Sequence, residues 1–346
     1  MRSVAAYVAD SSGGPLTRTA IPRRPVGPAD VLIDIHYAGV CHTDIHIARN
    51  EWGTTHYPVV PGHEIAGVVR EVGSEVTSHR PGDRVGVGCF VDACHECDAC
   101  TSGVEQHCLR GATLTYNSLT ADGTVTYGGY SSAIVVDHRF VVSIPDAIPL
   151  DAAAPIMCAG TTVYAPLRRF GVGTGTRVGI IGLGGLGHLG VMIARALGAE
   201  VTVLSQSSDK RDDALRFGAT RHFTTGAAAT FDELAGTFDV VLNTVSSKID
   251  LNPYFATLAR YGVLVELGIP DAPLELDGFS LILGDRSFAG SFVGSVRQTR
   301  EVLELCAENG IRPQIEVVAA SRVNEVFASI IDGRARYRYV LDTREL

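Results

Sequence analysis

Apolar positions in the second half of the chain follow two alternating patterns. Strand-length apolar runs occur as VGIIG from 178, EVTVLS from 200, FDVVLNTV from 238 and YGVLVELG from 261. Stretches with helical spacing follow these runs, and this alternation is typical of a parallel sheet covered by helices. The pattern predicts a doubly wound, parallel α/β domain in this part of the chain.

The first half of the chain has a different pattern of apolar residues and glycines. Short β-branched runs are separated by glycines at Gly62, Gly67, Gly73, Gly82, Gly86 and Gly88. This is the pattern of strands joined by tight turns. Beyond about residue 290 the spacing is helical over 299–309 and then strand-like in YRYVLD. We predict a β-rich domain over 1–157, an α/β domain over 158–290, and a segment, 291–346, that returns to the first domain.

Composition narrows the class of protein. A length of 346 residues fits two domains, and 46% hydrophobic content supplies buried cores. The net charge of −9 argues against nucleic-acid or acidic-membrane binding, which needs basic patches. Residues 178–199 are interrupted by glycines, His188 and Arg195, so they make a poor membrane span. The opening MRSVAAYVAD lacks the apolar core of a signal peptide, and we expect a cytoplasmic protein.

Four of the eight cysteines form one compact motif. Cys94, Cys97, Cys100 and Cys108 are spaced C-x2-C-x2-C-x7-C. Four thiolates close zinc tetrahedrally and leave no open position, which is typical of a structural site. The rival is an iron–sulfur cluster, whose bacterial ferredoxin spacing is C-x2-C-x2-C-x3-C-P. Here the last gap is longer and Leu109 follows the final cysteine, so the motif favours zinc.

A second set of possible ligands is dispersed along the chain. Cys41, the pair His63–Glu64, and Cys158 suit a catalytic zinc whose fourth position takes water or substrate. Cys89 and Cys306 match no ligand motif and are interpreted as ordinary thiols. A chain that carries a compact and a dispersed set indicates a zinc enzyme with two zinc ions.

A glycine-rich loop lies between a predicted strand and a predicted helix. It reads Gly182, Leu183, Gly184, Gly185, Leu186, Gly187. In that setting G-x-G-x-x-G predicts a dinucleotide site: the glycines permit the turn, the approach of the pyrophosphate and close helix packing. The helix N-terminus supplies free N–H groups for the phosphates.

The end of the next strand indicates which dinucleotide binds. An NAD site usually has Asp or Glu there to hold the ribose 2′-hydroxyl. This chain instead offers Ser205, Gln206, Ser207 and Lys210. Hydroxyls and a cation suit a 2′-phosphate, and we expect NADP. Asp209 is interpreted as a helix N-cap.

Several short motifs together resemble a known family. They are C-H-T-D-x-H at 41–46, P-G-H-E at 61–64, M-C-A-G at 157–160, V-E-L-G at 265–268 and R-Y-R-Y-V at 336–340. With the four-cysteine motif and the glycine-rich loop, they cover essentially the whole chain. The chain resembles the zinc-dependent medium-chain alcohol dehydrogenases, in their cinnamyl-alcohol-dehydrogenase-like, NADP-dependent branch. The resemblance implies a GroES-like catalytic domain, a Rossmann domain, a primary alcohol/aldehyde substrate reacting mainly as the aldehyde, and a homodimer.

The resemblance also implies roles for single residues. Cys41, His63 and Cys158 look like the catalytic zinc ligands, with Glu64 as an acidic neighbour that enters the coordination shell when substrate is absent. Asp44 is placed to orient His63.

The resemblance assigns proton transfer and a cofactor contact to residues that follow Cys41 in the sequence. Thr43 and His46 resemble the family's proton relay, in which Thr43 takes the alcohol proton and His46 exchanges it with solvent. An imidazole suits this step because it exchanges protons near neutral pH. His42 occupies the family's pyrophosphate-contact position.

Two other functions stay open at this point. A zinc-free quinone or enoyl reductase of the same superfamily is disfavoured because such enzymes lack both cysteine sets. A non-catalytic NADPH- or zinc-binding protein is disfavoured by the relay residues and the acidic charge.

Overall fold

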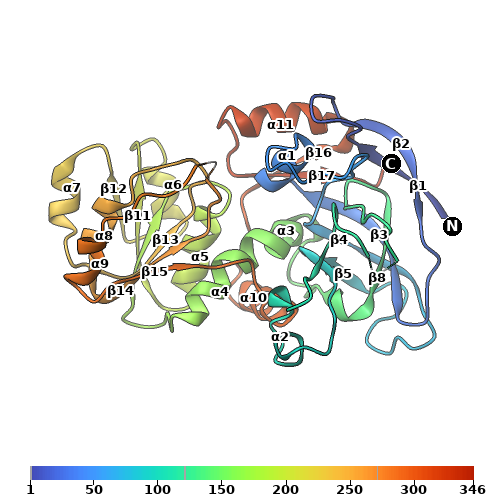
Figure 1. Cartoon of the computed structure of the whole chain (residues 1–346), viewed down its shortest axis with the longest axis horizontal. Helices are drawn as coiled ribbons and strands as arrows, with labels where there is room; N and C mark the ends of the chain where they lie inside the picture. Colours follow the sequence, from blue (N-terminus) through green and yellow to red (C-terminus); the bar gives the residue numbers. More distant parts are fainter. Residues whose placement is uncertain (1, 121, 271) are drawn as a thin grey trace. The chain divides into compact units, whose positions relative to one another are not determined.

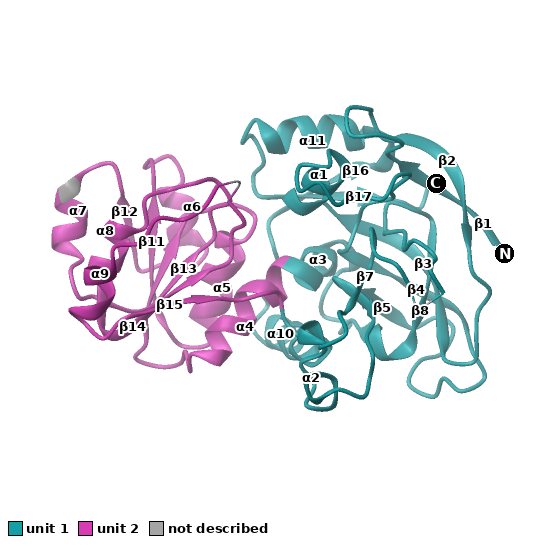
Figure 2. Ribbon diagram, in the orientation of Figure 1, with its two compact units in different colours: residues 1–158, 294–346 teal, residues 159–293 magenta. Residues whose placement is uncertain are grey.

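The computed structural model describes residues 2–120, 122–270 and 272–346, and it divides into two compact units (Figure 2). The first unit comprises residues 1–158 and 294–346, and the second comprises 159–293. The boundaries predicted from the sequence were 157/158 and 290/291, whereas the structure places them at 158/159 and 293/294.

A seven-stranded sheet forms the centre of the first unit (Figure 1). Its order is β16-β17-β3-β4-β5-β9, and β8 also pairs with β3. The strands are β3 (Asp30–Gly39), β4 (Ile65–Val72), β5 (Arg84–Val87), β8 (Ala133–Asp137), β9 (Val142–Ser143), β16 (Ile315–Ala319) and β17 (Arg338–Asp342). Because β17 pairs antiparallel with β3, the end of the chain joins the sheet that the first residues build.

Smaller elements complete this unit. The strands β1 (Arg2–Val8) and β2 (Thr17–Arg23) form a hairpin, and β6 (Phe90–Asp92) pairs with β7 (Thr113–Leu114). The helices are α1 (His42–Ala48), α2 (Asp98–Thr101), α3 (Leu150–Pro155), α10 (Val296–Glu308) and α11 (Val323–Ile331). Short 3-10 turns occupy η1 (Glu105–His107), η2 (His138–Phe140) and η4 (Ala320–Arg322), and a π-helical turn, η3 (Ile156–Gly160), follows α3.

The second unit is a parallel six-stranded sheet in the order β12-β11-β10-β13-β14-β15. The strands are β10 (Arg177–Ile181), β11 (Glu200–Ser205), β12 (Arg221–Thr224), β13 (Phe238–Asn243), β14 (Leu258–Glu266) and β15 (Ser287–Gly290). The helices are α4 (Thr161–Arg169), α5 (Gly187–Ala196), α6 (Arg211–Arg216), α7 (Ala228–Glu233), α8 (Asn252–Ala256) and α9 (Gly278–Ile282). This is the doubly wound fold that the sequence predicted.

The strand order of the second unit reverses direction at β10. The chain builds outward from β10 through β11 to β12, and then crosses to β13 on the other side of β10. In such sheets dinucleotides bind beyond the carboxyl ends of the strands, where the order reverses. The glycine-rich loop leaves β10 at this edge.

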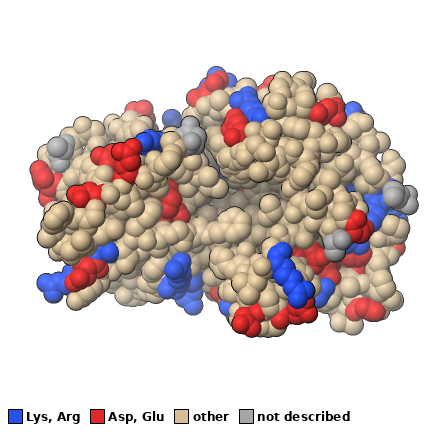
Figure 3. Space-filling view, viewed as in Figure 1, with Lys and Arg blue, Asp and Glu red and all other residues tan. Residues whose placement is uncertain are grey.

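The surface shows no concentration of one charge on the visible face. In Figure 3 basic and acidic side chains of the described residues occur as small separate groups of both signs. Within the described ranges, every helix is too short or too polar to span a bilayer.

Candidate metal and cofactor sites

Four potential ligands from distant parts of the first unit converge in its interior. Cys41, His63, Glu64 and Cys158 are all buried, and their ligand atoms lie within 4.8 Å of one another. His63 Nε2 is 3.2 Å from Cys158 Sγ, so both atoms can reach one ion. Two sulfurs, one imidazole nitrogen and a carboxylate oxygen form a donor set that suits zinc.

Local structure brings these side chains together. Cys41 is the N-cap of α1, at the point where β3 ends and the chain turns into the helix. His63 and Glu64 immediately precede β4, which pairs with β3. Cys158 lies within the π-helical turn η3. π-Helical turns are rare and often occur at functional sites, because the extra residue re-aims a side chain.

Asp44 connects the residues around the ligand cluster through hydrogen bonds. Its fully buried carboxylate accepts hydrogen bonds from Cys41 N at 2.8 Å, Gly62 N at 3.0 Å and the Tyr130 hydroxyl at 3.0 Å. His63 Nδ1 lies 3.2 Å from its Oδ1. With Nδ1 turned to the carboxylate, Nε2 is left to face the metal position. Tyr130 was missed by the sequence analysis, because no local pattern links it to Asp44.

Glu64 is paired with a cation that the sequence analysis did not single out. Its Oε1 accepts from Arg338 of β17, and both side chains are buried. Burial alone would lower the pKa of Arg338, but the neighbouring Glu64 carboxylate holds that pKa above its usual range, so the guanidinium stays charged. Glu64 Oε2 is buried without a hydrogen-bond partner among the described residues. An unpartnered buried carboxylate oxygen beside two thiols and an imidazole fits a metal ligand. The only sequence signal for Arg338 was the R-Y-R-Y-V motif.

The proposed relay residues lie on α1. Thr43 is half-buried. The His46 ring stacks on Trp52 at a centroid distance of 4.9 Å and lies tilted against the His42 ring at 4.8 Å. Glu51 contacts His46 Nδ1. The carboxylate therefore orients the ring with Nε2 available. The pairing of His46 with Glu51 was not predicted, although the short sequence separation of the two residues was a usable signal.

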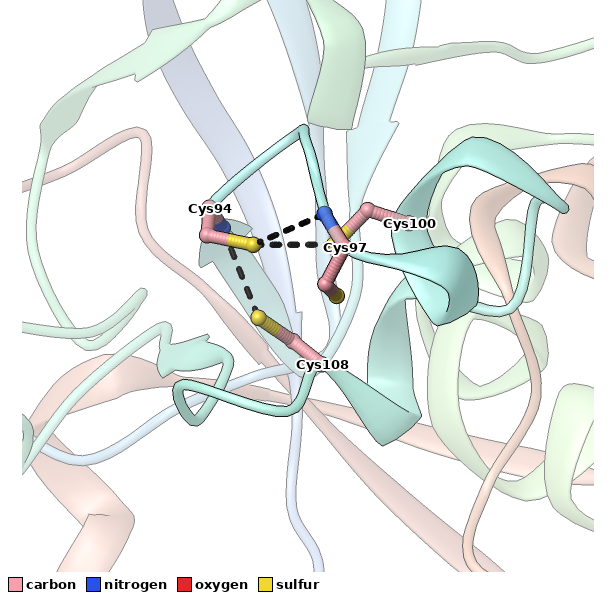
Figure 4. Close-up of side chains that lie close together, drawn as sticks. All are labelled: Cys94, Cys97, Cys100 and Cys108. Atoms are coloured by element: carbon pink, nitrogen blue, oxygen red, sulfur yellow. Dashed lines mark hydrogen bonds between the residues drawn. The ribbon is translucent and has the colours of Figure 1, made fainter.

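The four-cysteine motif folds into a compact lobe. Cys94, Cys97, Cys100 and Cys108 converge from a loop, from α2 and from the end of η1 (Figure 4), and their sulfurs lie within 4.8 Å of one another. The Cys94 and Cys100 sulfurs are 3.8 Å apart. Zn–S bonds of about 2.3 Å in a tetrahedron place the sulfurs about 3.8 Å apart. The observed separation therefore fits a zinc tetrahedron.

Backbone N–H groups point at these sulfurs. Cys97 N donates to Cys94 Sγ at 3.4 Å, Leu109 N to Cys97 Sγ at 3.5 Å, and Cys94 N to Cys108 Sγ at 3.5 Å. The N–H groups of Leu109 and Cys100 lower the pKa of Cys97 to about 6. Burial raises the pKa of Cys100 to about 12, so Cys97 is the sulfur that most readily takes the thiolate form that binds a metal.

The glycine-rich loop has the geometry of a dinucleotide turn. Gly182 has a φ of 85°, and a Cβ there would lie 2.7 Å from Val245 Cγ2. A Cβ on Gly187 would overlap the Gly182 carbonyl oxygen, so α5 begins in close contact with the turn. A Cβ on Gly184 would meet nothing within 4 Å, which leaves its backbone open to a ligand. Leu183 is buried, whereas Gly185 and Leu186 are half-buried.

The residues at the end of β11 gather beside this loop. Lys210 Nζ donates to the Leu183 carbonyl at 2.9 Å, which draws its ammonium to the glycine-rich loop. Gln206 and Ser207 are exposed, and the Ser205 hydroxyl donates to the Ser207 carbonyl at 2.7 Å. This edge carries hydroxyls and a cation, and the residues that end β11 include no carboxylate, so it fits a phosphate-bearing ribose.

Protein families match both units of the chain. The alcohol dehydrogenase GroES-like domain family matches residues 27–146, and the zinc-binding dehydrogenase family matches residues 185–308.

Individual relatives match the chain over its whole length. The NADP-dependent alcohol dehydrogenase C 1 of Mycolicibacterium smegmatis is 54% identical, over 100% of this chain and 99% of its own. The structure of a cinnamyl alcohol dehydrogenase from Sorghum bicolor has a TM-score of 0.96 at 41% identity, over 99% of this chain and 98% of its own. A Helicobacter pylori cinnamyl alcohol dehydrogenase in complex with NADP(H) has a TM-score of 0.93 at 37% identity, over 99% of both chains.

Proposed function

The chain belongs to the zinc-dependent medium-chain alcohol dehydrogenases, in their cinnamyl-alcohol-dehydrogenase-like branch, and we propose that it transfers a hydride between NADP(H) and a primary alcohol/aldehyde pair. The observation that carries this proposal is the buried cluster of Cys41, His63, Glu64 and Cys158, with its unpartnered carboxylate oxygen. Zinc there would polarise the carbonyl oxygen, and NADPH would supply the hydride.

The two cysteine-containing sites have separate roles in this proposal, and each chain binds two zinc ions. Cys41, His63 and Cys158 would be the catalytic ligands, and Glu64, which contacts Arg338, would enter the coordination shell when substrate is absent. Asp44 fixes the His63 ring. The four-cysteine lobe supplies no open position and is structural. All eight cysteines are free of disulfides, which fits a cytoplasmic, reducing environment.

A purified-enzyme assay tests the reaction class. Oxidation of NADPH should depend on added aldehyde, and a panel of short aliphatic, benzyl and cinnamyl aldehydes should rank the substrates. The reductive direction is expected where the cellular NADP pool is mostly reduced. Failure of every aldehyde to stimulate NADPH oxidation by zinc-loaded protein would contradict the proposal.

Proton exchange is the function we assign to Thr43 and His46. His46→Gln should lower alcohol oxidation by about 10- to 100-fold, at and below the low end of general acid–base contributions. Zinc content should not change, because His46 lies outside the ligand cluster. The deficit should shrink as pH rises, since hydroxide replaces the missing base. The check is the pH–rate profile of both proteins, and identical profiles would remove His46 from the mechanism.

The cofactor preference rests on the end of β11. NADPH should exceed NADH by at least about tenfold in kcat/KM, because charge-assisted hydrogen bonds contribute about 1.5–3 kcal/mol each. Gln206→Asp should shrink or reverse this preference through like-charge repulsion with the 2′-phosphate, whereas the neutral control Gln206→Asn should keep it. Lys210→Ala should weaken NADPH and spare NADH. Equal use of both cofactors by the wild-type enzyme would show that the 2′-phosphate site does not exist.

A homodimer joined through the second units completes the proposal. The segment around α9 exposes large apolar side chains, with exposed fractions of 68% for Phe279, 72% for Ile282 and 80% for Leu283. It precedes β15, the edge strand of the sheet, and no strand of the described residues pairs with its outer side. An exposed apolar group beside a sheet edge suits a second copy of the chain.

Disrupting this surface should separate the subunits. Each buried leucine contributes about 1.5–3 kcal/mol and occurs twice in a two-fold interface, so Leu283→Arg should weaken association at least about 100-fold. Sedimentation velocity should show dimers for the wild type and monomers for the variant at micromolar concentration. A wild-type monomer under the same conditions would contradict the assignment.

A further inference from the structure

A histidine from a neighbouring strand reaches the end of β11. His222 of β12 pairs with Val203 of β11, and Ser205 pairs with Thr224. Residues two apart in a strand share a face, so Ser205 and His222 lie on the same side of the sheet. The Ser205 Oγ is 2.8 Å from His222 Nε2. The imidazole therefore contacts Ser205, the residue at the ribose-binding position of a dinucleotide fold.

The hydrogen bonds of Ser205 fix which nitrogen carries the proton. The Ser205 hydroxyl has a single proton and donates it to the Ser207 carbonyl at 2.7 Å. His222 Nε2 must then be the donor in the second contact. An N–H donor thus points toward the end of β11, and an incoming acceptor that displaces the hydroxyl from Ser207 would meet both groups.

The charged side chain that acts on the His222 ring is a cation. Burial first, and then the charge of Arg211 at the start of α6, lower the pKa of His222. The ring contacts the neutral Ser205 hydroxyl from β11, the charge of Arg211 from α6 acts on it, and a backbone hydrogen bond of His222 itself raises the pKa in the opposite sense. No carboxylate among the described residues contributes to its charge state. The ring is therefore mostly neutral at pH 7 in the free protein, and an added anion would favour its protonation.

We infer that His222 is a specificity-determining residue for the 2′-phosphate of NADP(H), and that it takes up a proton when the phosphate binds. This inference rests on the proposed use of NADP(H). Ser205 of β11, Lys210 at the N-cap of α6 and His222 of β12 then surround the phosphate. A dianion near the ring offsets the field of Arg211, and the imidazolium returns a charge-assisted hydrogen bond. The affinity for NAD(H), which lacks the phosphate, does not increase when His222 is protonated.

The sign of the pH dependence follows from this linkage. The phosphate raises the affinity of the ring for a proton, so NADP⁺ should bind more tightly as pH falls toward the pKa of His222 in the complex. Phosphate itself gains a proton near pH 6, so the comparison is made at pH 7.0 and 8.5. The wild type should bind NADP⁺ about 3- to 10-fold more tightly at pH 7.0, with no comparable change for NAD⁺.

Calorimetric titration with NADP⁺ and NAD⁺ tests the inference without relying on turnover. His222→Gln keeps a donor but cannot become charged, so the pH dependence of NADP⁺ binding should disappear. His222→Phe should also lower NADP⁺ affinity about tenfold at pH 7.0 and spare NAD⁺. In buffers of different ionisation enthalpy, NADP⁺ binding to the wild type should show proton uptake that both variants lack.

The outcomes separate this inference from the proposed cofactor preference. If the wild type does not prefer NADP⁺ to NAD⁺, the cofactor proposal fails together with this inference. If the wild type prefers NADP⁺ and His222→Phe retains that preference with unchanged proton uptake, only the role of His222 is overturned. Matching melting temperatures of the variants and the wild type exclude a folding defect as the cause of weaker binding.

Discussion

Replacing Cys158 by serine should abolish turnover while the protein stays folded. In the proposed site the variant would lose one of the two thiolates that hold the catalytic metal, whose Lewis acidity would supply several kcal/mol of transition-state stabilisation. Since about 1.36 kcal/mol corresponds to a tenfold change in rate, kcat should fall about 1,000-fold or more. Zinc analysis should find one ion per chain in place of two, with the four-cysteine lobe still occupied.

The matched control is another buried cysteine. Cys306 of α10 is fully buried and lies outside both ligand sets. Cys306→Ala should keep two zinc ions and nearly normal turnover, although it removes a buried sulfur. Near-normal activity of Cys158→Ser, or loss of both zinc ions from it, would contradict the division of roles between the two sites.

Replacing Cys97 by serine should lower the thermal stability and leave much of the turnover. With a zinc ion in the lobe, as proposed, the local structure would depend on the metal, because metal binding and folding are coupled. A loss of about 2 kcal/mol lowers the melting temperature by about 4–8 °C for a domain of this size. At low temperature, however, the catalytic cluster should be intact and much of the activity should remain.

Calorimetry and zinc analysis together check this second prediction. The variant should contain one zinc ion, melt earlier and retain kcat at 10 °C within a few-fold of the wild type. An unchanged melting temperature with the lobe empty would show that the lobe metal is not structural. Iron in place of zinc in the purified wild type would overturn the interpretation of this motif.

The strands, the glycine-rich loop and the compact four-cysteine set could be predicted from sequence because each has a local signature. β10 and the start of α5 follow from an apolar run, a turn of glycines and helical spacing. The spacing of Cys94, Cys97 and Cys100 places three ligands on one short segment, so their convergence needs little tertiary information. The dispersed set was recognisable only through family motifs, since no spacing rule joins Cys41 to Cys158.

The partners that tune the sites were not predictable in this way. Arg338 pairs with Glu64 across 274 residues, and Tyr130 reaches Asp44 across 86. The Arg338 contact depends on how strands pack, because β17 joins the sheet beside β3, which carries the chain to Cys41. Tyr130 lies in the loop before β8, whose position no local sequence pattern reveals. His222 belongs to this group as well, because its contact with Ser205 depends on the register of β12 against β11.

The fate of a labelled hydride tests the proposed reaction most directly. NADPH that carries deuterium at both C4 positions is incubated with the zinc-loaded enzyme and cinnamaldehyde, which has a carbonyl and a carbon–carbon double bond. We predict cinnamyl alcohol with one deuterium on C1, and Cys158→Ser should yield none. Deuterium at C3 of a saturated aldehyde would identify an enoyl reductase, and the absence of label in any product would contradict hydride transfer by this protein.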